Sequence, residues 1–230
     1  MPLARYPEVT TLTVDAVGAD VMEGMLRVDE NTLAHSLATG AMTMEAMRWA
    51  GCTESTIALG AVAGVLHDVG KFHPKIQHLM AEAQGQKFTP DQARLMRTHA
   101  SRGFLSLARN GAPGALRNTP AIDAAAYTAL MHHHAFTKEQ YATSEYAGIA
   151  HTVQLCDVAH ARLLDSTRSY RVARDGAAYT PHQIGRQIVS QFTELPPQPD
   201  GQIIPVEGLV LSWAEEATRR QDLALLTDEC

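Results

Sequence analysis

Cysteine is scarce in this chain of 230 residues. Its three cysteines, Cys52, Cys156 and Cys230, lie far apart, and none of them belongs to a C-x-x-C pair. The sequence therefore predicts neither a disulfide framework nor a zinc ribbon. Such cysteine usage is typical of a reducing compartment, so we expect a cytoplasmic protein.

An excess of basic residues and long apolar runs are also lacking. The net charge is −6 at pH 7, which argues against a protein that coats nucleic-acid polymers or lies on a membrane, because both need a basic face. No apolar stretch approaches the roughly 18–20 residues that span a bilayer. The opening MPLARYPEVTTLTVDAVGAD has no apolar signal core. We therefore expect neither a nucleic-acid nor a membrane partner, although a few local cations could still hold a small anion.

Strand signals are scarce as well, and apolar residues recur instead at helical spacing. The sequence predicts helices over 32–50, 55–68, 89–109, 121–134, 144–165, 180–194 and 210–226. The segment LPPQPDG at 195–201 is too rich in proline for a helix, and a short extended piece is expected at 202–208. We predict an all-α fold with a lead-in at 1–28 packed on the core, a main unit at 29–194 and a C-terminal extension at 195–230.

Several of these helices begin with recognisable capping residues. Thr53 or Ser55 can cap the helix that follows. Two further helices open with Thr-Pro, at 89–90 and 180–181, where the threonine can cap and the proline suits the first turn.

Histidine, by contrast, is abundant. Ten of the eleven histidines fall between His35 and His160, and three are consecutive at His132–His134. Neutral imidazole is the commonest metal ligand and the commonest acid–base group near neutral pH. Five predicted helices each offer a histidine, an aspartate or both: His35, His67 with Asp68, His99, the run His132–His134, and Asp157. Inward-facing side chains of neighbouring helices can hold ions in the core of a helical bundle.

The segment AGVLHDVGKFHP, residues 63–74, places imidazole, carboxylate, glycine and ammonium at the end of an apolar helix. A helix end that happens to be polar is the simplest interpretation. A metal centre explains more, because Asp157 also lies in an apolar helix, where a carboxylate is costly unless it is paired or binds metal. Imidazole with carboxylate suits iron, manganese, zinc or nickel better than magnesium or calcium.

The order of these residues resembles the HD superfamily of metal-dependent phosphohydrolases, and within it the HD-GYP group. The resemblance runs from about residue 29 to about 190. It is carried by NTLAHSLATG, AGVLHDVGK, KFTPDQARLMRTHASRGFLSL, LMHHH, QLCDVAHARLLD and STRSYRVA. It implies an HD-domain helical bundle, over 29–194, around a binuclear metal site.

The resemblance also implies the metal ligands. Those of one ion are His35, His67, Asp68 and Asp157. Asp68 bridges to a second ion, which His99 and two histidines of the triplet complete. His133 and His134 are preferred for this role because the family's histidine pair directly precedes a loop, and His132 is the alternative through a one-residue slip.

Two ions, not three, are expected. HD proteins that bind a third ion carry a glutamate one turn before the first histidine. Asn31 occupies that position here. Iron or manganese is the first expectation for both ions, with zinc and nickel as alternatives.

The activity implied is that of a phosphodiesterase. Two metal ions roughly 3.5–4 Å apart hold a hydroxide that attacks phosphorus in line. By the resemblance, Lys71 meets the substrate phosphate, and Arg168 and Arg171 are cations near its other edge. The leaving oxygen needs a proton donor, for which His151 and His160 are the candidates.

The substrate predicted first is a cyclic dinucleotide, with cyclic-di-GMP as the first choice. HD-GYP proteins carry a Gly-Tyr-Pro loop just after the histidine pair, whereas this chain has HHHAFTKEQYATSEYAGIAH. That difference favours the alternative of a phosphohydrolase for another nucleotide or phosphate ester. Two further alternatives are a di-iron oxygenase and a non-enzymatic domain that binds a nucleotide or a protein. The sequence leaves the oligomeric state open.

Overall fold

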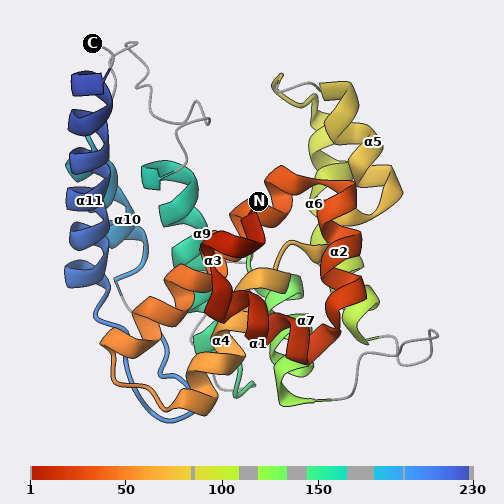
Figure 1. Cartoon of the computed structure of the whole chain (residues 1–230), viewed down its shortest axis with the longest axis horizontal. Coiled ribbons are helices and arrows are strands. Elements are labelled where there is room, and N and C mark those ends of the chain that lie inside the picture. Colours follow the sequence, from red (N-terminus) through yellow and green to blue (C-terminus); the bar gives the residue numbers. More distant parts are fainter. Residues whose placement is uncertain are drawn as a thin grey trace.

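The structure is a computed structural model that describes residues 2–83, 86–108, 119–133, 144–164, 179–193 and 195–227. These residues form helices joined by turns and irregular segments, with no strand among them (Figure 1). The α-helices are α1 (Pro7–Val17), α2 (Ala19–Val28), α3 (Glu30–Trp49), α4 (Glu54–Leu66), α5 (Pro74–Ala83), α6 (Pro90–Ala108), α7 (Pro120–Met131), α9 (Ala147–Ala159), α10 (Pro181–Gln191) and α11 (Val206–Thr227). Shorter helical turns are η1 (Pro2–Arg5), η2 (Val69–Phe72) and the π-turn η3 (His160–Leu164). The predicted all-α class is confirmed.

The helix starts follow from local side-chain hydrogen bonds. Of the two capping residues considered before α4, Thr53 is the one that accepts a hydrogen bond from the backbone N–H of Thr56. The two Thr-Pro openings are both capping boxes of the form T-P-x-Q. In each, the threonine hydroxyl accepts from the backbone of the glutamine, whose side chain accepts in return from the threonine N–H.

Several segments differ from the sequence prediction, which had no helices at the positions of α1, α2 and α5. Of the extended piece expected at 202–208, residues 202–205 are irregular, whereas 206–208 already belong to α11, with the Pro205 carbonyl accepting from Leu209 N–H. The helix expected over 144–165 is regular only over α9, and His160 begins a π-turn.

Helix α4 organises the core. It packs against α1, α3, α7 and α9, and nearly all of its residues from Thr56 onward are buried, as expected for a helix that is apolar on all sides. At the crossing with α3, a Cβ on Gly64 would lie 2.6 Å from the Cα of Gly40, so only glycine permits this approach. Because His67 and Asp68 directly follow α4, this central position carries both side chains into the interior, where they are 0% and 1% exposed.

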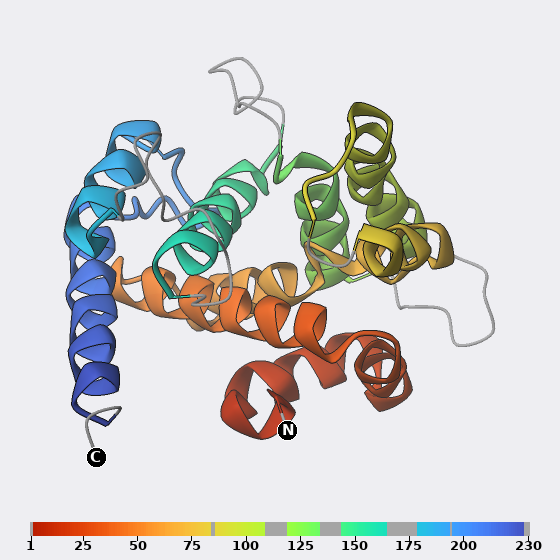
Figure 2. The ribbon, with the colours of Figure 1, turned by 90° about the horizontal axis from the view of Figure 1, so that it is seen from above.

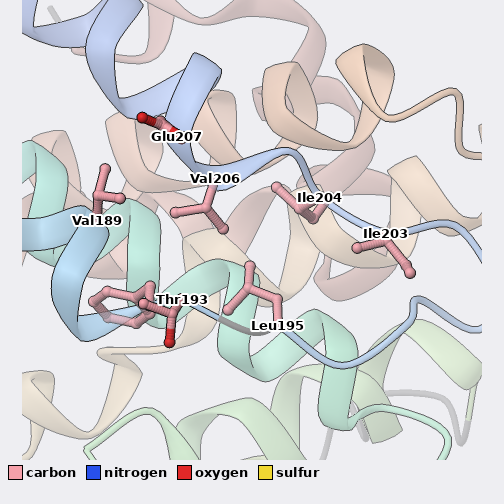
Figure 3. A pocket seen from close by; sticks show the side chains of 8 residues that line it. Val189, Thr193, Leu195, Ile203, Ile204, Val206 and Glu207 are labelled. Carbon is pink, nitrogen blue, oxygen red and sulfur yellow. The ribbon is translucent and has the colours of Figure 1, made fainter.

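The remaining helices lie at the two ends of the molecule. Both views place the α10–α11 pair at one end and α5 with α6 at the other (Figures 1 and 2). Where α10 ends and α11 begins, a mainly apolar cavity of about 530 Å³ is lined by residues such as Phe192, Leu195 and Ile204 (Figure 3). Among the described residues, no helix combines the length and the apolar composition that crossing a membrane requires.

Candidate metal centre

Three helices bring one group of ligand-type side chains together. His35 comes from α3, His67 directly follows α4, and Asp157 comes from α9. Asp157 Oδ1 lies 2.9 Å from His35 Nε2 and 3.8 Å from His67 Nε2. One nitrogen or oxygen of each residue lies within 4.8 Å of the others, so this group could hold a metal ion.

A second group lies beside the first. Asp68 Oδ1 is 3.1 Å from Nε2 of His99 in α6 and 3.5 Å from Nε2 of His132, the residue that directly follows α7. His133 Nε2 is 3.1 Å from His99 Nε2. These four residues form a second set that could hold a metal ion.

Asp68 lies between the two groups. Its Oδ1 faces His99 and His132, while its Oδ2 lies 3.4 Å from Nε2 of His67 in the first group. The Lys71 ammonium, whose side chain is 19% exposed, also bonds to Oδ2. A carboxylate buried this deeply needs cationic partners on both oxygens.

The outer nitrogens of the imidazoles indicate which atoms face the centre. His67 Nδ1 lies 2.7 Å from the Gly64 carbonyl oxygen, and His99 Nδ1 lies 2.6 Å from that of Met96. His132 Nδ1 is likewise 3.0 Å from the Ala129 carbonyl oxygen. A carbonyl only accepts, so each Nδ1 is the donor, and in a neutral ring Nε2 then keeps its lone pair. Lone pairs of Nε2 directed inward are the usual arrangement of metal-binding histidines.

Burial and the neighbouring carboxylates shift the pKa values of the imidazoles. Burial lowers the pKa of both His35 and His132, so these rings are neutral at pH 7. Burial would also lower the pKa of His67, but the carboxylate of Asp68 outweighs it and raises this pKa.

The two carboxylates are ionised. Burial alone would raise the pKa of Asp68, but Lys71 and His67 hold it well below its usual range. Burial opposes ionisation of Asp157 too, and the hydrogen bond with His35 holds its pKa low. Two negative charges therefore lie among the imidazoles of the two groups.

Two buried atoms without hydrogen-bond partners also indicate a cation site. Among the described residues, neither His67 Nε2 nor Asp68 Oδ1 has a hydrogen-bond partner, although both atoms are buried. Buried polar atoms are normally satisfied. A cation between these lone pairs would satisfy both, so the donor set and its geometry fit a metal ion of the borderline class.

The structure brings together most of the residues that the sequence singled out. The residues found in the two groups are His35, His67, Asp68, His99, His132, His133 and Asp157. His132, the alternative from the one-residue slip, thus lies with His133 beside Asp68. His134, Arg168 and Arg171 lie outside the described residues.

His160 also lies next to the first group. His160, considered as a proton donor, lies with its Nδ1 2.9 Å from Nδ1 of His35. Its spacing of three residues from Asp157 was the available signal, because that spacing places both side chains on one face of α9.

The other proton-donor candidate, His151, does not belong to either group. It is 8% exposed, and its ring packs against Phe192 at a centroid distance of 6.1 Å. Burial lowers the pKa of His151 to about 4.

This buried histidine predicts a loss of stability in acid. In the unfolded chain a histidine titrates near pH 6.5, so between pH 6.5 and about 4 the unfolded state binds a proton that the folded state excludes. The free energy of unfolding should therefore fall by about 2–3 kcal/mol over this interval through His151 alone. Urea unfolding of the metal-free protein at several pH values should show a shallower acid limb for His151→Leu. Equal slopes for the two proteins would contradict this.

Comparison with known proteins does not assign this chain to a family. No family model matches the chain, and no curated protein matches it. The resemblance to HD phosphohydrolases is therefore a prediction from the order of the motifs.

Proposed function

We propose that this protein is a metal-dependent phosphohydrolase that cleaves a phosphodiester, with a cyclic dinucleotide, cyclic-di-GMP first, as its substrate. The observation that carries the proposal is the position of Asp68. One carboxylate with an oxygen directed to each of two imidazole-containing groups is the arrangement expected of a ligand shared by two metal ions.

Each side chain has a definite part in this proposal. His35, His67 and Asp157 would hold one divalent ion, His99, His132 and His133 would hold the other, and Asp68 would serve both. The ions, iron or manganese by the donor set, supply a hydroxide at neutral pH and neutralise phosphate oxygens when bound.

Lys71 supports the choice of a phosphate substrate. Its ammonium contacts the buried Asp68 but keeps part of its surface open to solvent. It is thus a fixed positive charge beside the centre, able to bind a non-bridging phosphate oxygen as negative charge develops on it.

The test is an anaerobic turnover assay of protein supplied with Fe²⁺ or Mn²⁺. Cyclic-di-GMP, a panel of nucleotides and bis(p-nitrophenyl) phosphate are followed by anion-exchange chromatography or absorbance. We expect hydrolysis of at least one phosphodiester, with kcat lower by about 10²-fold in Lys71→Met at unchanged metal content.

The outcomes separate the alternatives. Turnover of a phosphomonoester alone would move the assignment to another nucleotide or phosphate ester. Because imidazole with carboxylate also suits a di-iron centre, oxygen-dependent loss of a phosphonate or polyol would replace hydrolysis by oxygenation. Nucleotide binding without turnover under any metal would indicate a receptor.

A further inference from the structure

His35 differs from three other imidazoles of the centre in what holds its outer nitrogen. In His67, His99 and His132, Nδ1 lies against a backbone carbonyl three residues earlier in the chain. In His35 it lies against the side chain of His160, 125 residues away, with Nδ1 atoms 2.9 Å apart and ring centroids 4.9 Å apart.

We propose that His160 is a positioning residue that fixes the ring and the tautomer of the metal ligand His35. This inference rests on the metal centre of the proposed function. It assigns to His160 a role distinct from proton donation to the leaving group.

One proton lies between the two rings. A hydrogen bond between two Nδ1 atoms needs a proton on one and a lone pair on the other. If His35 uses Nε2, the atom directed to Asp157, to bind a metal ion, its proton must be on Nδ1. His160 Nδ1 is then the acceptor, and it takes the place that the backbone carbonyl takes for the other ligands. Such an outer partner orients the ring and raises its basicity.

Helix α9 and the π-turn that continues it contact His35 at both of its ring nitrogens. Asp157 contacts Nε2, and His160, three residues later, contacts Nδ1. The change from α-helix to π-turn begins at His160. Such local changes of helix geometry are frequent at functional sites because they redirect a side chain.

His160 also borders open space, which makes it suitable for mutation. It lines a cavity of about 550 Å³ together with residues from η1, α3 and α11, among them Arg5, Glu45, Trp213 and Glu216. A side chain of similar size can therefore replace it without overfilling a closed core.

The test compares two variants of similar volume. In His160→Asn the side-chain carbonyl oxygen stands near the position of Nδ1 and can accept from His35, whereas His160→Leu has no acceptor. Zn²⁺ affinity and stoichiometry are measured by competition with a chromophoric chelator, and the environment of the ions by the absorption spectrum of the Co²⁺ form. His151→Leu, on the same helix but outside both groups, is the control.

We expect His160→Leu to lose about 10–100-fold in affinity for one ion while the other remains bound. His160→Asn should recover most of this loss, and His151→Leu should bind both ions as the unmodified protein does. Equal weakening in the Asn and Leu variants, or unchanged affinity in the Leu variant, would overturn the role of His160 alone. Failure of the unmodified protein to bind Zn²⁺ or Co²⁺ would overturn the proposed metal centre together with this inference.

Discussion

Replacement of Asp68 by asparagine is expected to abolish turnover and to remove tight binding of metal. The carboxylate is 1% exposed, and its two oxygens face different groups of imidazoles. An asparagine keeps one oxygen but turns an N–H donor, which cannot bind a cation, toward one of the groups. Activity should fall by at least about 10³-fold, or about 4 kcal/mol of transition-state stabilisation.

The measurements for this variant are metal content after gel filtration and kcat on the best phosphodiester substrate. Circular dichroism distinguishes loss of the site from loss of the fold. Asp91→Asn is a matched control, because Asp91 is an exposed carboxylate in the first turn of α6 that pairs with Arg94. If the Asp68→Asn protein retained metal and full turnover, the proposed ligand set would be wrong.

Replacement of Gly70 by alanine is expected to destabilise the fold and to displace the second group of ligands. A Cβ on Gly70 would lie 1.9 Å from the carbonyl oxygen of His99 and 2.6 Å from the backbone nitrogen of Gly103. These are backbone atoms of α6, so they cannot move aside as a flexible side chain would. Overfilling of this kind costs about 3 kcal/mol or more of unfolding free energy.

The same change should weaken the metal site, because η2 and α6 must separate and carry His99 away from Asp68, whose Oδ1 now lies 3.1 Å from His99 Nε2. Urea unfolding and metal binding measure the two effects. Gly24→Ala in α2 is the control, since a Cβ there meets no atom within 4 Å. It should be neutral or stabilise by about 0.5–1 kcal/mol. If Gly70→Ala unfolded within about 1 kcal/mol of the unmodified protein, this packing argument would fail.

The sequence by itself determined many of the helices and the residue types of the site, although α1, α2 and α5 were not predicted. Thr53, Thr89 and Thr180 fix helix starts through bonds to residues three positions away, so they are visible in a short window of sequence. The apolar spacing that follows each start marks the side that packs, because burial of that side stabilises the helix. His67 and Asp68 were recognisable for the same reason, since they directly follow α4, the most apolar of the described helices.

The position of His132 and His133 beside His99 depends on tertiary structure, and His134 lies outside the described residues. Successive side chains at the end of a helix point in different directions, so their use depends on where α7 ends against α6. The helix ends at Met131, and this places His132 and His133 toward His99. Spacing along the sequence sets neither that end point nor the packing of the two helices.

Only the tertiary structure decided the partners of His35 and the need for glycine at position 70. His35 and His160 are 125 residues apart, and they meet because α3 and α9 pack together and α9 turns into a π-turn at His160. Gly70 must be glycine because the backbone of α6 passes against it. Local sequence specifies which groups are available for hydrogen bonds and ligation, whereas the distance between groups far apart in the chain is set by how the helices pack.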